Sequence, residues 1–274
     1  MTAPGGGRAD DLTPASLQRG LRSAVFGHRI FHYPSIGSTN DRALELAAAG
    51  EDEGALVVAE AQTRGRGRRD RTWASAAGAG IYASLILRPG LPAPRAPLLT
   101  LLAAVAVARG LRDTAGVAAG IQWPNDVVAG RRKIAGILAE TRGAGPVVRD
   151  VVVGLGINVN QAAADFPPGV RDRATSVRME TGRPAARAAI LVAILEIFER
   201  GYTRLLRAGA ADLLREWESL AAIPRGGRIA VESAAGKREG TVAGLDEEGA
   251  LLLATAGGDT ERIAFGEIVR VDWP

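Results

Sequence analysis

The most informative stretch of this 274-residue chain is GRGRRDRTW, Gly65 to Trp73. Its two glycines let the backbone approach a ligand closely, and its arginines supply guanidinium donors that pair with carboxylates or phosphates in a bidentate way. Such a cluster of like charges repels itself. We therefore expect the loop to be disordered when empty and to order around an anion, with Trp73 offering an aromatic face. Taken alone, the segment fits a solvated basic loop or a nucleic-acid patch equally well.

The charge of the chain is concentrated in the same place. Residues 64–71 hold five arginines and one aspartate, so their excess of four positive charges equals the net charge of +4 of the whole chain. The remaining residues are therefore neutral overall, in spite of a pI near 10.1. A protein that binds duplex nucleic acid spreads its basic residues over a broad face, so this distribution disfavours that class.

Several other classes are excluded or disfavoured by composition. The absence of cysteine removes disulfides and thiolate metal sites, and His28 and His32 lie in a segment that we expect to be extended or irregular, which disfavours a metal role. No GxxxxGK[ST] phosphate loop occurs. The longest apolar run, around residues 101–108, is shorter than a membrane span, and residues 1–11 lack the apolar core of a signal peptide. We expect a cytoplasmic protein without a membrane partner.

Three further segments carry candidate functional residues. Lys133 is one of only two lysines and stands at the entry to an apolar strand, where a compact point charge can follow a reacting oxygen. Trp123-Pro124-Asn125-Asp126 forms a rigid turn with two polar side chains, and residues 154–160 end a strand with two glycines and two amides. Each segment also has a purely structural interpretation: Lys133 as an exposed lysine in a hairpin, residues 123–126 as an ordinary turn, and residues 154–160 as a tight loop at the end of a strand.

The pattern of apolar residues predicts two structural parts. Helices are expected over 17–25, 42–49, 98–111, 187–207 and 211–220, and strands over 55–59, 81–87, 120–123, 126–129, 134–141 and 147–157, with short connections that imply antiparallel neighbours. Ser38 followed three residues later by Asp41 is a helix-start signature for the second of these helices, and Gly50 is its natural end. Beyond Pro224, five short strands over 229–233, 239–245, 250–255, 262–265 and 268–271 describe a small β-barrel.

Taken together, the motifs resemble those of biotin protein ligases. The matching stretches follow the order of that family from about residue 30 onwards: GSTN at 37–40, AEAQ at 59–62, GRGRRDRTWAS at 65–75, WPND at 123–126, RKIAGIL at 132–138, GLGIN at 154–158 and DEEGALL at 246–252. The resemblance implies an α+β fold with a mixed, largely antiparallel sheet like that of class II synthetases, and an SH3-like C-terminal barrel. It divides the chain into an N-terminal tail and helix (1–30), a catalytic domain (31–223) and the barrel (224–274).

The resemblance also implies the reaction and the residues that perform it. Biotin and ATP would form biotinyl-5'-adenylate, and a lysine of the biotin carboxyl carrier domain of an acyl-CoA carboxylase would then take the biotinyl group. Mg²⁺ would accompany ATP, held mainly by phosphate oxygens. Lys133, Arg68 and Asp126 are the expected catalytic residues, with Asp126 orienting Lys133 or assisting the incoming lysine. The expected ligand-binding residues are Ser38, Thr39, Asn40, Gln62, Gly65, Arg66, Gly67, Arg68, Arg69, Arg71, Trp73, Asn125, Lys133, Gly136 and Asn158.

Two positions depart from the family pattern. Arg64 stands where the family usually has a small residue, and Asp70 stands where glycine is common, so pairing between the two would stiffen the loop. No winged-helix unit fits into residues 1–35, so neither DNA binding nor repression is expected. Dimerisation through an exposed sheet remains open. The alternatives are a lipoate or octanoate ligase of the same superfamily, disfavoured by the arginine loop, and a nucleic-acid-binding module.

Overall fold

The computed structural model describes residues 12–143, 145–233 and 236–272. Its main sheet has seven strands in the order β1-β2-β3-β9-β7-β6-β5. Strands β1 and β2 are parallel, whereas each of the other neighbouring pairs is antiparallel, so the prediction of a mixed, largely antiparallel sheet is confirmed. The bounds are Ile30–Tyr33 (β1), Leu56–Ala59 (β2), Gly80–Leu87 (β3), Ala119–Gln122 (β5), Asp126–Ala129 (β6), Arg132–Arg142 (β7) and Asp150–Asn158 (β9).

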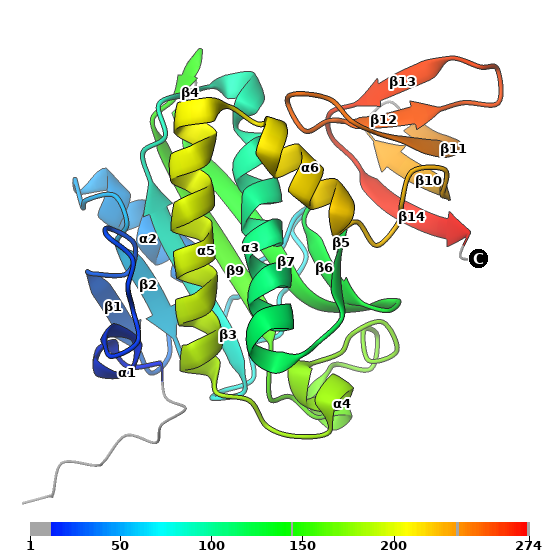
Figure 1. Ribbon diagram of the computed structural model, residues 1–274. Coiled ribbons are helices and arrows are strands. Elements are labelled where there is room, and N and C mark those ends of the chain that lie inside the picture. Colours follow the sequence, from blue (N-terminus) through cyan, green and yellow to red (C-terminus); the bar gives the residue numbers. More distant parts are fainter. Residues whose placement is uncertain (1–11, 144, 234–235, 273–274) are drawn as a thin grey trace, which may run out of the picture.

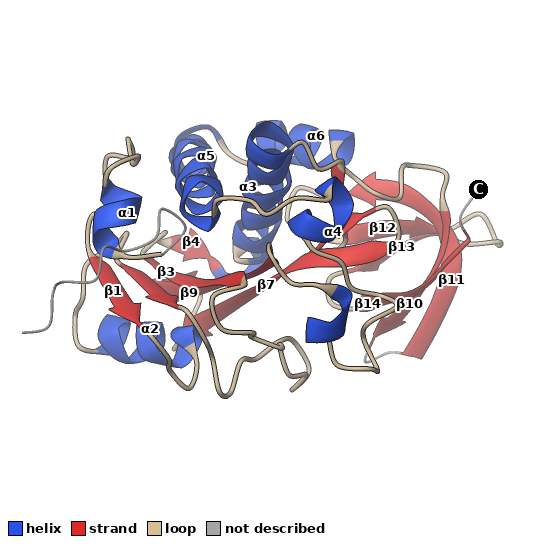
Figure 2. Cartoon of the chain, turned by 90° about the horizontal axis from the view of Figure 1, so that it is seen from below, coloured by secondary structure: helices blue, strands red, loops and turns tan. Residues whose placement is uncertain are grey.

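Helices cover both faces of this sheet. The long helices α3 (Pro97–Ala115) and α5 (Arg187–Ala208) run side by side across one face (Figure 1), and α2 (Thr39–Ala48) packs on the other (Figure 2). Residues 93–115, which include α3, are apolar and long enough to cross a membrane, but 67% of the apolar window is buried inside the molecule, as in a core helix. The shorter helices are α4 (Val177–Thr181), α6 (Ala211–Ser219), η1 (Ala93–Arg95) and η2 (Ala163–Asp165).

Strand β9 shows how the sequence distributes residues between the two faces. Successive side chains of a strand point to opposite faces. The odd positions Val151, Val153, Leu155 and Ile157 join the large core cluster on the α3 side. The even positions of the same strand include Gly154 and Gly156, so the α2 side of the sheet lacks side chains at these two points. That open face is where the functional cavity forms.

The five predicted C-terminal strands are present as a second, antiparallel sheet in the order β13-β12-β11-β10-β14. It lies on the β5 side of the main sheet (Figure 1). The buried Trp123, which follows β5, donates its indole N–H to the carbonyl of Gly249 at 3.1 Å. The bounds are Arg228–Ser233 (β10), Gly236–Leu245 (β11), Leu251–Ala254 (β12), Thr260–Ile263 (β13) and Glu267–Asp272 (β14). We call β10–β14 the C-terminal sheet.

Two local predictions are wrong. The first helix, α1, spans Pro14–Gln18 rather than 17–25, because Thr13 caps it and Glu196 and Glu199 of α5 accept hydrogen bonds from the backbone amides of residues 22 and 24–26 instead. The strand expected over 147–157 is interrupted, since Val147–Val148 (β8) pairs with Leu91–Pro92 (β4) outside the main sheet. Residues 1–11 of the expected tail lie outside the described residues.

Candidate active site

A cavity of about 760 Å³ opens on the α2 side of the main sheet. Its walls come from the start of α2, the arginine loop (Gly65–Trp73), strands β6, β7 and β9, residues 166–174 and strand β14. The structure brings fifteen of the sixteen predicted site residues to this cavity: Ser38, Thr39, Asn40, Gln62, Arg66, Gly67, Arg68, Arg69, Arg71, Trp73, Asn125, Asp126, Lys133, Gly136 and Asn158. The sixteenth, Gly65, is buried behind the loop, where a Cβ would lie 2.6 Å from the carbonyl oxygen of Trp73.

Hydrogen bonds fix the orientation of the polar side chains at the α2 end. Ser38 caps α2, as predicted, by accepting from the amide of Asp41. The backbone amide and the hydroxyl of Thr39 both donate to Oε1 of Gln62, at 2.8 and 3.1 Å. Asn40 receives a hydrogen bond from Ser84 Oγ at 2.6 Å. All three residues at the helix start are buried, so the end of the cavity presents a preorganised polar surface.

The arginine loop is folded as a short hairpin. Arg66 forms an antiparallel bridge with Thr72, and the amide of Gly67 donates to the carbonyl of Arg71 at 2.7 Å. At the tip, Arg69 and Asp70 have φ of 55° and 56°, the left-handed region that glycine adopts most easily. This backbone conformation explains why glycine suits position 70, and aspartate tolerates it better than most residues do.

Trp73 lies over the two glycines that face each other on the central strands. Gly136 of β7 pairs with Gly156 of β9, and a Cβ at either position would come within 3.0 Å of the indole ring. The indole nitrogen is buried without a protein partner. The absence of side chains on this part of the sheet therefore leaves room for the indole ring of Trp73 to pack against the strands.

Lys133 and Asp126 form an ion pair in the same cavity. The ammonium of Lys133 lies 2.5 Å from Oδ1 of Asp126 and 5.5 Å from the centre of the Trp73 ring. A bulge makes this possible: Val128 pairs with Lys133 but Val127 pairs with Ala135, so Lys133 and Gly136 reach the same face of β7. The position of Lys133 at the strand entry agrees with the prediction, while the bulge was not predicted.

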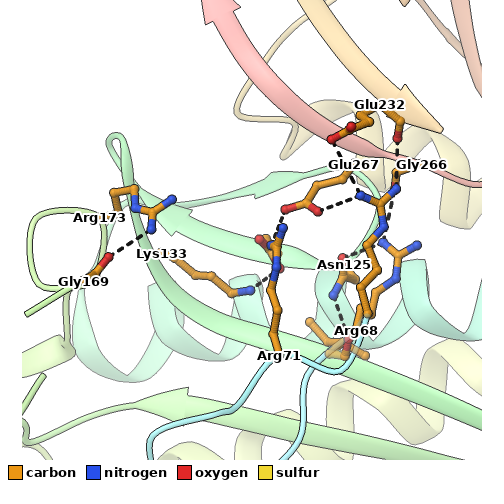
Figure 3. A network of polar contacts seen from close by, with 12 residues as sticks. Arg68, Arg71, Asn125, Lys133, Gly169, Arg173, Glu232, Gly266 and Glu267 are labelled. Carbon is orange, nitrogen blue, oxygen red and sulfur yellow. Dashed lines mark hydrogen bonds and ion pairs between the residues drawn. The ribbon is translucent and has the colours of Figure 1, made fainter. Parts of the chain in front are cut away.

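Carboxylates distant in sequence neutralise three of the loop arginines. Arg66 contacts Asp41 Oδ1 at 2.7 Å and Glu140 Oε2 at 2.8 Å. Glu267 of β14 lies 2.5 Å from Arg71 and 3.4 Å from Arg69. Its hydrogen bond to Arg71, drawn in Figure 3, raises the pKa of the Arg71 guanidinium above its ordinary value. The sequence-based expectation that the arginines repel one another did not take these carboxylates into account. Arg64 also differs from expectation, since its guanidinium lies against Gly37 rather than Asp70.

Arg68 is held in a different way, by two uncharged acceptors. Its Nη1 donates to Asn125 Oδ1 at 3.1 Å and to the carbonyl of Gly266 at 3.2 Å (Figure 3). Burial and the neighbouring Arg69 lower the pKa of the Arg68 guanidinium, although an arginine remains protonated at neutral pH. Asn125 is itself fixed by donating to the carbonyl of Ile137 at 2.9 Å. The WPND turn therefore positions an arginine that, among the described residues, forms no ion pair, although Asp126 and Glu267 lie near enough to act on its charge.

The sequence did not point to two contributions to this site. Residues 166–174 line the cavity, and their chain is joined to Lys133, whose amide donates to the carbonyl of Arg173 and whose carbonyl accepts from Thr175. Glu140 and Glu267 carried no motif, because their role depends on contacts with arginines more than 70 residues away. Within the described ranges, no group of three His, Cys, Asp or Glu side chains is placed to hold a metal ion.

Fold and cavity define an enzyme of the biotin and lipoate ligase class. Residues 33–158 match the biotin/lipoate A/B protein ligase family, and residues 226–271 match the biotin protein ligase C-terminal domain. The chain belongs to the biotin protein ligase family.

Relatives support this membership over most of the chain. It is 41% identical over 247 residues to the bifunctional ligase/repressor BirA of Bacillus spizizenii, covering 90% of this chain and 76% of that protein. It is 34% identical over 283 residues to the biotin–[acetyl-CoA-carboxylase] ligase of Mycobacterium tuberculosis, covering 96% and 98%. Among solved structures, the biotin protein ligase of Aquifex aeolicus in complex with biotin and ATP superimposes with a TM-score of 0.78 at 28% identity, covering 89% of this chain and 100% of the other.

Proposed function

We propose that this ligase attaches biotin to a lysine of a biotin carboxyl carrier domain in two steps. A carboxylate oxygen of biotin attacks the α-phosphorus of ATP, the bond to the β-phosphate breaks, and pyrophosphate leaves. The amine of the acceptor lysine then attacks the acyl carbon, an amide forms, and AMP leaves while the amine loses a proton. The observation that carries the proposal is the single cavity that joins the polar end at α2 to Lys133, Trp73 and the arginine loop.

The hydrogen-bond inventory of the α2 end supports biotin as the ligand there. The two N–H groups of the Asn40 amide are occupied by the Leu138 carbonyl and Glu140, so Asn40 has only an acceptor to offer. Gln62 uses Oε1 for Thr39 and one N–H for Ser75, which leaves one donor. An acceptor beside a donor complements the N–H and C=O groups of a cyclic urea. Ser38 adds a hydroxyl to the same surface.

The charges around Lys133 support the adenylation step. Bringing a carboxylate to within about 4 Å of a phosphate costs roughly 4 kcal/mol at an effective dielectric constant near 20, which is about three powers of ten in rate. Lys133 and Arg68 are placed to offset this repulsion, and Asp126 holds the ammonium in position. We assign the Trp73 ring, Arg71 and Asn158 to the nucleotide, with magnesium bound through the phosphate oxygens.

The same proposal includes the domain organisation, the protein partner and the cellular location of the enzyme. We assign residues 31–223 to the catalytic domain and residues 224–274 to a domain that completes the cavity, because Glu267, Ile268 and Val269 line it. The partner is the biotin carboxyl carrier domain of an acyl-CoA carboxylase, in the cytoplasm. No repressor activity is proposed.

ATP-dependent transfer of labelled biotin to an isolated carrier domain tests the function directly. We expect pyrophosphate release that depends on biotin and label that co-migrates with the carrier, and a carrier whose acceptor lysine is replaced by arginine is the matched control. Release that depends on lipoate or octanoate instead would favour the alternative ligase. Salt-sensitive binding of oligonucleotides without biotin-dependent release would contradict the proposal altogether.

A further inference from the structure

Glu140 of β7 holds two parts of the cavity with one oxygen atom. Its Oε2 accepts a hydrogen bond from Nδ2 of Asn40 at 2.7 Å and lies 2.8 Å from Nη2 of Arg66. Its side chain is 24% exposed, which is low for a surface glutamate and leaves the contact with Arg66 only partly screened by water. No sequence motif singled this residue out, and it does not line the cavity itself.

The first part held by Glu140 is the amide of Asn40. Ser84 donates to Oδ1 of this amide at 2.6 Å, and the Leu138 carbonyl takes one of its N–H groups at 3.1 Å. Glu140 takes the other N–H group, so the amide cannot rotate without breaking a charge-assisted bond. A Cβ at residue 154 would overlap the amide, which shows how closely β9 confines it.

The second part is the beginning of the arginine loop. Nη2 of Arg66 is shared between Glu140 and Asp41, whose Oδ1 lies at 2.7 Å, and Arg66 also forms the hairpin bridge with Thr72. Asp41 directly follows Asn40 on α2, and its carboxylate pairs with Arg66 of the loop rather than with the Asn40 amide. The two carboxylates therefore differ in what they hold: Asp41 binds the loop through Arg66, while Glu140 binds both Arg66 and the amide of Asn40.

We propose that Glu140 is a positioning residue that couples closure of the arginine loop to recognition of the ligand by Asn40. When Arg66 docks, it fixes the carboxylate that orients the amide acceptor; when a ligand engages that acceptor, the same carboxylate is held ready for Arg66. This inference rests on the proposed biotin ligase function, because the ligand at Asn40 is taken to be biotin. It adds a residue and a coupling that the ligase reaction itself does not require.

Three substitutions separate the two contacts. Asp41→Asn weakens the contact with the loop, and Glu140→Gln weakens the contacts with both the loop and the Asn40 amide. Ser84→Ala removes the hydrogen bonds to the Asn40 amide and to the hydroxyl of Thr39, and leaves the loop contact in place. Glu45→Gln is the matched control, because Glu45 also pairs with an arginine but lies on the exposed side of α2, outside the cavity. Each variant is measured for KM of biotin and kcat in pyrophosphate exchange, and for the rate at which trypsin cuts the arginine loop with and without biotin.

The expected pattern differs between the three. A charge-assisted hydrogen bond corresponds to roughly ten- to hundredfold in affinity, so we expect Glu140→Gln to raise the biotin KM by at least about tenfold with a smaller change in kcat. Ser84→Ala raises KM without faster cutting, and Asp41→Asn speeds cutting with little change in KM. Biotin slows cutting in the wild type and in Asp41→Asn, but no longer does so in Glu140→Gln. Glu45→Gln behaves as the wild type.

The coupling is overturned if Glu140→Gln keeps the wild-type KM, or if biotin still protects its loop from trypsin. It is also overturned if the loss is confined to kcat and scales with the unfolded fraction in a melting curve, because a merely structural role predicts that result. Should Glu140→Gln fail to fold, Glu140→Asp, which keeps the charge but withdraws it by one methylene, is measured in the same way. If the wild type shows no biotin-dependent exchange, the proposed function fails, whereas trypsin cutting without biotin still reports on the loop contact.

Discussion

Replacing Gly156 with alanine tests whether the packing of the Trp73 ring against β9 is needed for the reaction. Gly156 lies in β9 and is paired with β3 on one side and β7 on the other, so its backbone has little freedom to move. A Cβ at this position would lie 2.6 Å from Cε2, 2.8 Å from Nε1 and 3.0 Å from Cδ2 of the Trp73 indole. Since all three are atoms of one rigid ring, the substitution must displace the ring rather than a flexible chain end.

The size of the displacement follows from these distances. Non-bonded carbon atoms rest about 3.5–4.0 Å apart, so the indole has to move by roughly 1 Å. Misplacing a positioning group by about 1 Å costs roughly a hundredfold in rate, whereas overpacking costs about 1–3 kcal/mol of stability. The ammonium of Lys133, 5.5 Å from the ring centre, has to readjust as well. We therefore expect Gly156→Ala to fold but to lose about a hundredfold in kcat/KM for ATP.

Biotin-dependent pyrophosphate exchange at varied ATP concentration measures this loss. Gly257→Ala is the matched control, because the nearest atom to its Cβ is 3.9 Å away and the residue lies in an exposed turn of the C-terminal sheet. Biotin affinity, measured by calorimetry, should change less than about twofold, since Ser38 to Asn40 are untouched. A folded Gly156→Ala enzyme with the wild-type kcat/KM for ATP would refute the assignment of Trp73 to the nucleotide.

Three other perturbations have defined outcomes. Lys133→Ala should lower pyrophosphate exchange by about a thousandfold, the equivalent of roughly 4 kcal/mol, with little change in melting temperature, and wild-type turnover would contradict its role. Glu267→Gln should change stability by less than about 1 kcal/mol, because its partner Arg71 is largely exposed to water, but should let trypsin cut the arginine loop faster; unchanged cutting would exclude docking through Glu267. Glu60→Gln should destabilise the fold by about 3–5 kcal/mol in urea, because Arg187 is only 2% exposed and loses its carboxylate partner. Burial raises the pKa of Glu60, but hydrogen bonds from Arg187 and the backbone amide of Leu12 together lower it by more than burial raises it, so the pKa is below its ordinary value. The wild type should therefore have this stability above about pH 4.5 and lose it as the pH falls through the lowered pKa, whereas Glu60→Gln should lack that loss.

Periodicity alone was sufficient to predict most of the main sheet and its helices. The run VVVGLGIN at 151–158 alternates apolar residues with glycines after its first positions, and the structure places the apolar set against α3 and the glycines under the cavity. The polar start of α2 was equally readable, because Ser38 is a helix cap with an acidic residue three positions later. Such features depend on neighbours in sequence, which a single chain displays directly.

The features that escaped prediction depend on contacts between distant segments. The bulge that brings Lys133 and Gly136 to one face arises where β6 and β7 pair out of register, and no residue type in the hairpin requires it. The parallel pairing of β1 with β2 needs the whole of α2 as a crossover. Helix α1 ended early because side chains of α5 offered hydrogen bonds to the backbone that a longer helix would have used itself.

The same reasoning changes the meaning of the excess of positive charge. In the sequence, Arg64 to Arg71 carry the whole net charge of the chain, but in the fold α2, β7 and β14 bring carboxylates to the arginines at 66, 69 and 71. Arg68 instead meets the neutral acceptors Asn125 Oδ1 and the Gly266 carbonyl. A polyanion entering the cavity can therefore meet Arg68 without breaking an ion pair, whereas it has to compete with Glu267 for Arg71. The guanidinium side of that pair is open to water, because Arg71 is 64% exposed, so we expect Arg71 to exchange its carboxylate partner for a phosphate without unfolding of the loop.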